Sequence, residues 1–149
     1  YDRSAQLYVL ESSGICVASM RVNRGRDGLM DCEEYFPDIA HGALRPMIGS
    51  ASRFVKRDPK KAELSLMREF IDVIRRRELG LGIKVDLINV HDRMANYYLR
   101  VGYLSIPNTS FTHPRFGTPS HIMFRVLDPT WDHLHEFHCE VHLENSHAY

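Results

Sequence analysis

Apolar side chains recur at three- and four-residue intervals between Leu66 and Ile74, which places them on one face of a helix. Asp58 precedes this run as a candidate N-cap, and Pro59 follows at a position where a helix needs no backbone N–H. Gly80 comes after a cationic last turn and is the expected stop. The pattern therefore predicts a long amphipathic helix between Pro59 and Gly80.

Strand-like runs lie on both sides of this helix. Residues 50–56 alternate small, polar and apolar side chains, and residues 83–90 form a β-prone run. Two strands joined by a helix favour a right-handed β-α-β crossover. We expect Asp92 to cap a second helix over residues 93–101, which Gly102 ends.

The N-terminal part reads as a hairpin followed by a helical turn. Residues 6–11 and 15–21 are strand-like and are separated by Ser12-Ser13-Gly14, a turn signal. Residues 29–39 are expected to form a short helical turn that breaks at Pro37.

After the second helix, residues 105–119 form a long loop with three prolines, and such loops are often functional. Residues 121–127 are the last predicted strand, and 129–149 keep helical spacing as a C-terminal extension. The elements together predict an α/β fold over 1–149 as one domain, with a mixed sheet and helices on both sides.

The composition is that of one globular domain, because 149 residues with 44% hydrophobic and 26% charged content can build a sizeable core. A net charge of +0 argues against bulk binding of nucleic acid. Cys16, Cys32 and Cys139 are odd in number and widely separated, which favours a reducing cytoplasm. No apolar run is long enough to predict a transmembrane segment. The chain opens at Tyr1 rather than Met, so we allow for a preceding segment that would matter for the substrate.

The segment from Arg53 to Arg77 is locally basic, with nine Lys and Arg against four acidic residues. A solvated helix face is one interpretation of this excess. A docking site for a phosphate at the helix N-terminus is the other. The sequence leaves both open.

Four metal-ligand types would share one face of the C-terminal extension: His135, His138, Cys139 and His142. The histidines of HEFH are three residues apart, which is not the HExxH spacing of metalloproteases, and no second cluster completes a ligand shell. We therefore predict no metal site.

Several motifs resemble known proteins when taken together. The segment LMDCEEYFPDIAHGALRP, the later SASRFV, the upstream ASMRV and the closing RVGY keep a common order. They resemble the acyl-homoserine-lactone synthases and the long-chain N-acyl amino acid synthases of the GCN5-related N-acyltransferase superfamily. The resemblance covers residues 7–127 and implies a splayed central sheet that binds an acyl thioester.

The resemblance also implies roles for individual residues. Tyr98 matches the tyrosine that protonates the leaving thiolate, and Arg53 is the second catalytic candidate, although a buried ion pair is an alternative role for it. Without the resemblance, Tyr98 beside Tyr97 would be assigned to the core. The implied substrate-binding residues are Arg21, Phe36, Ser50 and His121. The implied thioester-binding residues are Phe54, Val55, Lys56, Lys60, Lys61 and Ser65.

Three carboxylates lie near the expected cleft, and the sequence does not rank Glu33, Glu34 and Asp86 as general bases. Backbone N–H groups near Phe54 are expected to hold the oxyanion. On general grounds His121 fits a surface or core histidine better than a base.

Two departures from the family pattern bear on the donor and acceptor. Ser50 stands where the lactone synthases have a glutamate that serves the S-adenosylmethionine-derived amine. The segment KRDPKKAE lacks the glycines of the coenzyme A pyrophosphate loop. We therefore expect acyl carrier protein as the partner, with an acyl-phosphopantetheine thioester as donor substrate, an amino acid as acceptor, and no tightly bound cofactor.

The expected function is N-acylation of an amino acid by a long acyl chain. Three alternatives stay open: acyl-homoserine-lactone synthesis, acetyl-CoA-dependent N-acetylation of a small molecule, and a catalytically silent acyl-thioester-binding module.

Overall fold

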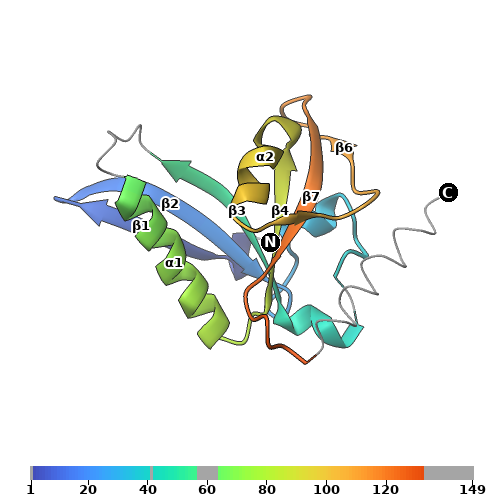
Figure 1. The fold of residues 1–149 in the computed structure, drawn as a ribbon, viewed down its shortest axis with the longest axis horizontal. Helices are drawn as coiled ribbons and strands as arrows, with labels where there is room; N and C mark the ends of the chain where they lie inside the picture. Colours follow the sequence, from blue (N-terminus) through green and yellow to red (C-terminus); the bar gives the residue numbers. More distant parts are fainter. Residues whose placement is uncertain (1, 41, 57–63, 133–149) are drawn as a thin grey trace.

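The computed structural model describes residues 2–40, 42–56 and 64–132, and all structural statements below concern these residues. They form a mixed seven-stranded sheet in the order β1-β2-β3-β4-β7-β5, with β6 paired to β7 (Figure 1). The strands are β1 (Gln6–Ser12), β2 (Ile15–Arg24), β3 (Ile48–Lys56), β4 (Val85–His91), β5 (Leu104–Ser105), β6 (Phe111–Thr112) and β7 (Pro119–Val126). The helices are α1 (Leu64–Gly80) and α2 (Asp92–Arg100), with 3-10 turns η1 (Asp2–Ser4), η2 (Asp31–Glu34) and η3 (Gly42–Met47).

The predicted hairpin is confirmed as β1 and β2, and β2 runs three residues further than expected. Ser13 and Gly14 connect the strands with φ values of 52° and 73°. Positive φ at both central residues is what a type I′ turn requires, and this turn matches the twist of the paired strands.

The predicted β-α-β unit is confirmed as β3, α1 and β4, with β3 and β4 parallel. Phe70 and Ile74 of α1 pack on a row of β2 side chains: Ala18, Met20 and Val22. The predicted helix start at Asp58 and Pro59 lies outside the described residues.

Helix α2 begins one residue earlier than predicted, so Asp92 is its first helical residue rather than its cap. His91 has extended backbone angles and occupies the cap position, without a side-chain capping hydrogen bond. The predicted stop is confirmed, because Gly102 has a φ of 92° and its N–H bonds to the Leu99 carbonyl.

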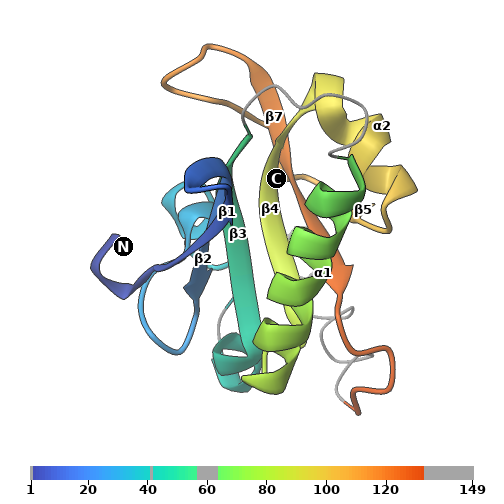
Figure 2. The ribbon, with the colours of Figure 1, turned by 90° about the vertical axis from the view of Figure 1, so that its left-hand side faces the viewer.

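Both faces of the sheet are covered, by different kinds of helix. Figure 2 shows α1 and α2 on one face and the turns η2 and η3 on the other. The core under the turns joins Met30, Leu44, Leu87 and Phe124, with Trp131 closing it after β7. The sheet therefore has two separate cores, one on each face.

The C-terminal extension is only partly described. Residues 129–132 are turns rather than the predicted helix, and the candidate metal ligands from His135 to His142 lie outside the described residues. Among the residues described, no group of side chains could hold a metal ion, and no helix is long and apolar enough to cross a membrane.

The packing of α1 is tested by adjacent substitutions on its two faces. Ile74 is 3% exposed and Val73 is 48% exposed. We expect Ile74→Ala to lower the free energy of unfolding by about 3 kcal/mol, because it leaves a cavity against β2. Val73→Ala should change it by less than about 0.5 kcal/mol. Urea unfolding of both variants measures this, and equal effects would contradict the orientation of α1.

Candidate functional site

The central feature is an opening in the backbone sheet where two parallel strands separate, which we call the cleft. β3 and β4 pair over residues 48–50 and 85–87, and their ladder then ends although both strands continue. β2 stays paired with β3 as far as Lys56, and β7 stays paired with β4 as far as His91. Figure 1 shows the two strands together at one end and apart at the other. Beyond Ser50, the backbone of β3 is therefore not paired with that of β4.

A β-bulge shapes the β3 side of this cleft. Ser19 pairs with Val55 and Arg21 pairs with Ser52, so one β2 residue faces two β3 residues, Arg53 and Phe54. Arg53 has a φ of 50°, a conformation that costs a non-glycine residue about 1 kcal/mol. Such strained positions cluster at functional sites.

The bulge also sets the exposure of three predicted site residues. Arg53 is exposed, so the alternative of a buried ion pair is wrong. Phe54 is 38% exposed and Val55 is 61% exposed, which leaves their apolar surface available to a ligand.

Tyr98 lies on α2 among aromatic rings at the root of the cleft. Its ring packs perpendicular to that of Tyr103, with centroids 5.5 Å apart, and it also contacts Tyr97. Burial, and then the neighbouring Tyr97 and Asp86, raise the pKa of the Tyr98 hydroxyl. Tyr98 is therefore protonated at neutral pH, as a proton donor must be.

Asp86 is the carboxylate at this root. Its Oδ1 accepts the backbone N–H of Ala51 at 3.0 Å, and its Oδ2 accepts the Tyr103 hydroxyl at 2.5 Å. Burial raises its pKa to about 6, while these two hydrogen bonds act in the opposite direction. The other two carboxylates considered from sequence lie elsewhere: Glu33 binds Arg45 and the Met30 N–H on the η2 side, and Glu34 is exposed.

A buried ion pair forms one wall of the cleft on the η2 side. Arg21 of β2 donates to both Asp31 carboxylate oxygens at 2.6 and 2.5 Å, and its Nε donates to the Ser52 hydroxyl at 3.2 Å. These contacts tie η2 to β2 and β3. The predicted substrate-binding residue Arg21 therefore already holds a carboxylate of its own chain.

The β4 wall on the same side carries Asn89. Its Nδ2 donates to the Asp31 carbonyl at 3.5 Å, and its buried Oδ1 has no hydrogen-bond partner within the described residues. Ser50 lies on the floor between these walls and is fully buried. Unpaired buried acceptors are costly, so the Asn89 carbonyl is a candidate acceptor for a ligand N–H.

Aromatic side chains form the outer rim of the η2 side. Tyr35 stacks on Phe111 at 4.1 Å, and Phe36 meets Phe111 edge-on at 6.1 Å. His113 and Phe116 continue the cluster from the proline-containing loop. Phe36 was predicted from its motif, but the loop rings were not assigned individually, because only folding brings them against Tyr35.

His121 lies apart from this constellation. It is on β7, so β4 separates it from β3. Its Nε2 lies 3.2 Å from the Ser105 hydroxyl and its Nδ1 lies 2.9 Å from Asp92. Ser105, His121 and Asp92 thus have the order of a nucleophile, a base and an orienting acid. The backbone N–H that follows Ser105, that of Ile106, bonds to the Ile122 carbonyl, so it cannot stabilise an oxyanion.

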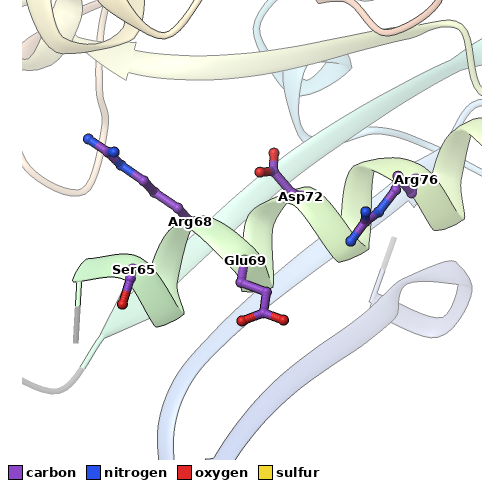
Figure 3. A pocket seen from close by; sticks show the side chains of 5 residues that line it. All are labelled: Ser65, Arg68, Glu69, Asp72 and Arg76. Carbon is purple, nitrogen blue, oxygen red and sulfur yellow. The ribbon is translucent and has the colours of Figure 1, made fainter. Parts of the chain in front are cut away.

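Ser65, a predicted thioester-binding residue, lies at the start of an open hollow along α1. Figure 3 shows Arg68 and Asp72 on one side of the helix, Ser65 and Glu69 on the other, and Arg76 further along. The residues that line the hollow include two cations and two anions, so the hollow itself has no excess of positive charge. Lys60 and Lys61 lie outside the described residues, as does the environment of the Lys56 side chain.

Comparison with known proteins identifies the fold. No family model matches the chain, and no curated protein matches its sequence. FeeM, an N-acyl amino acid synthase from uncultured soil microbes, superposes with a TM-score of 0.67 and 14% identity, over 87% of this chain and 75% of FeeM. The AHL synthase LasI gives a TM-score of 0.61 and 18% identity, over 82% of this chain and 64% of LasI. The ribosomal-protein-S18-alanine N-acetyltransferase from Escherichia coli gives a TM-score of 0.56 and 10% identity, over 88% of this chain and 74% of that enzyme.

These matches confirm the predicted architecture. The chain has the GCN5-related N-acyltransferase fold, with its mixed, splayed sheet. Identities of this size establish the fold alone, and the chain spans about two thirds to three quarters of the length of these three proteins.

The raised pKa of Asp86 predicts a pH dependence of stability. The pKa of about 6 in the folded state lies above the ordinary aspartate pKa of 3.8, so between these pH values the folded state binds more protons than the unfolded state. Stability from this group is therefore present below pH 4 and is lost as pH rises towards 6, by about 3 kcal/mol.

Asp86→Asn removes this loss, so the variant should gain stability relative to the wild type as pH rises from 4 to 6.5. Urea unfolding at several pH values measures the difference in unfolding free energy between variant and wild type. The contributions of all other titrating groups cancel in this difference. A difference that stays constant with pH would contradict the assignment.

Proposed function

We propose that the chain is an N-acyltransferase that moves an acyl group from a phosphopantetheine thioester to an amine. The observation that carries this proposal is the opening between β3 and β4 beyond residues 50 and 87, with the Arg53 bulge on one side and Tyr98 at its root. The fold shared with N-acyltransferases supports it.

The open edge of β3 suits the donor. A phosphopantetheine arm carries two amide groups, which can pair with strand backbone as an added strand does. The exposed apolar surface of Phe54 and Val55 lies along the same stretch. The thioester carbonyl then lies near the bulge, where backbone N–H groups and Arg53 can stabilise negative charge.

The reaction is a direct transfer within a ternary complex. The amine nitrogen attacks the thioester carbon, a C–N bond forms, and the carbonyl oxygen becomes an oxyanion. Collapse breaks the C–S bond, and Tyr98 gives its proton to the leaving sulfur. The nitrogen releases a proton to water, and Tyr98 regains one from solvent. Holding the reactants together supplies much of the rate.

We assign the amine to the η2 side of the cleft. The unpaired Asn89 Oδ1 can accept an amine N–H there, and the rim of Tyr35 and Phe111 can pack against the rest of the acceptor. We still propose His121 as a substrate contact on the basis of the resemblance, although it lies on β7, beyond β4 from β3.

For the donor we propose acyl carrier protein, and for the acceptor an amino acid, which would place the reaction in the cytoplasm. The glycine-free, basic segment KRDPKKAE supports a carrier with an acidic surface over coenzyme A. Ser50 argues against lactone synthesis, because it is uncharged and fully buried where the lactone synthases have a glutamate. Long-chain acyl groups remain part of the proposal by resemblance.

Mass spectrometry of lipid extracts tests the function directly. A bacterium expressing the full-length protein should accumulate long-chain N-acyl amino acids, which identifies acyl group and acceptor together. Acyl-homoserine lactones would contradict the acceptor. An extract identical to that of the control strain, with the protein folded, would favour an acetyl-CoA enzyme or a silent binding module.

The role of Tyr98 is tested against its neighbour. Tyr98→Phe should lower kcat about 100-fold or more, because the leaving sulfur loses its proton donor while the ring packing is kept. Tyr97→Phe removes a hydroxyl from a ring that is 46% exposed and should leave kcat nearly unchanged. Thiol release from an acyl thioester measures both, and an active Tyr98→Phe protein would contradict the role.

The choice of donor is tested by charge reversal at Lys60 and Lys61. The double change Lys60→Glu, Lys61→Glu should raise KM for decanoyl-acyl carrier protein about tenfold or more, because like charges then face each other. KM for decanoyl-CoA should change much less. Equal changes for both donors would argue against acyl carrier protein as the partner.

A further inference from the structure

The end of the β3–β4 ladder is made by a side chain. Ser50 and Leu87 are the last paired residues of these strands. The next N–H on β3 that points towards β4, that of Ala51, donates to Oδ1 of Asp86 at 3.0 Å. A side-chain carboxylate of β4 thus holds the β3 backbone at the level where the two strands separate.

The other oxygen of the same carboxylate reaches towards the proposed proton donor. Oδ2 accepts the hydroxyl of Tyr103 at 2.5 Å, which fixes the Tyr103 ring. The Tyr98 ring packs perpendicular to this ring, at an interplanar angle of 86°. Arg125 lies over the Tyr103 ring, 5.9 Å from its centroid. One carboxylate therefore connects the cleft backbone with the orientation of Tyr98.

Among the described residues, Asp86 is a buried carboxylate with an unpaired polar group nearby. It is buried beneath α1, beside a cavity of about 30 Å³ that Ile74, Arg75 and Glu78 also line. The buried Nε of Arg75 has no hydrogen-bond partner within the described part of the chain. A core that needed only stability would fill this position with an apolar side chain, since a buried charge is costly.

We infer that Asp86 is a positioning residue for acyl transfer, which fixes the β3 backbone at Ala51, at the root of the β3–β4 cleft, and orients Tyr98 through Tyr103. The inference rests on the proposed function. Asp86 does not touch the reacting atoms. It fixes where the strand edge becomes available to the thioester and where the Tyr98 hydroxyl stands above it.

Two measurements test the Asp86–Ala51 contact and the acyl-transfer rate separately. Amide hydrogen exchange, followed by NMR at the Ala51 amide, reports the contact without any substrate. The variants are Asp86→Ala, Asp86→Asn and Tyr103→Phe. The control is Asp27→Asn, which changes a carboxylate on the loop after β2.

Exchange at Ala51 should accelerate about tenfold or more in Asp86→Ala, relative to amides in the β4–β7 ladder of the same protein. Tyr103→Phe should leave Ala51 protected, because the Oδ1 contact remains. If Asp86→Ala does not fold, Asp86→Leu takes its place, since its apolar side chain offers the Ala51 N–H no acceptor. Unchanged Ala51 exchange in the folded variant would overturn the proposed fixing of the β3 backbone at the cleft.

The kinetic part uses decanoyl-acyl carrier protein with an equimolar mixture of the twenty amino acids, and follows thiol release. Asp86→Asn and Tyr103→Phe should each lower kcat about 10- to 100-fold with KM for the carrier nearly unchanged, because the reacting groups are misaligned while the carrier surface is intact. Asp27→Asn should match the wild type.

A role confined to stability would give a different result. The folded variants would then keep the wild-type kcat per folded molecule and differ only in unfolding free energy, which overturns the positioning role. An inactive wild type would count against the proposed function and also against this role, since positioning for transfer has no meaning without transfer. The Ala51 exchange result would still decide whether Asp86 fixes the β3 backbone at the cleft.

Discussion

The structure depends on a sheet that is closed over three residue pairs and open beyond them. A parallel strand pair normally continues as long as both backbones run side by side, because each unpaired N–H or carbonyl in a buried position is costly. β3 and β4 separate after residues 50 and 87, yet each keeps its outer partner to its end. The outer ladders supply the stability, and the inner edges are where we propose that the thioester binds.

Ion pairs hold the irregular segments that border this opening. Arg21 with Asp31 fixes η2 against β2, Arg45 with Glu33 closes η2 onto η3, and a bidentate pair at 2.7 Å joins Arg24 of β2 to Glu78 of α1. A buried ion pair adds little net stability over apolar packing, but it is specific in direction, and breaking it leaves a buried charge. The turns around the cleft also pack apolar side chains into the core beneath them, and the directional contacts fix their orientation in addition.

The elements of the fold could be predicted from sequence because their signals are local. The period of Phe70 and Ile74 predicts α1, and Ser13-Gly14 predicts the hairpin turn, since each depends on neighbours a few residues away. The same reasoning misplaced the cap of α2, because the Asp92 carboxylate binds His121, which lies 29 residues further along the chain. A distant partner of this kind leaves no local pattern.

The site could be predicted only in part, for the same reason. Tyr98, Arg53 and Phe54 were proposed through motifs whose order resembles a family, not through any property of their own positions. An arginine in the sequence does not indicate a left-handed φ. Arg53 adopts this conformation only because the pairing of β2 with β3 imposes the bulge.

Asp86 shows where local reasoning ends. In sequence it is one acid in a β-prone run, indistinguishable in role from Glu33 and Glu34. In the fold it lies at the one level where β3 leaves β4, so its carboxylate meets Ala51 and Tyr103 together. The register of the parallel pair, which no single segment encodes, decides that this carboxylate rather than another stands at the root of the cleft.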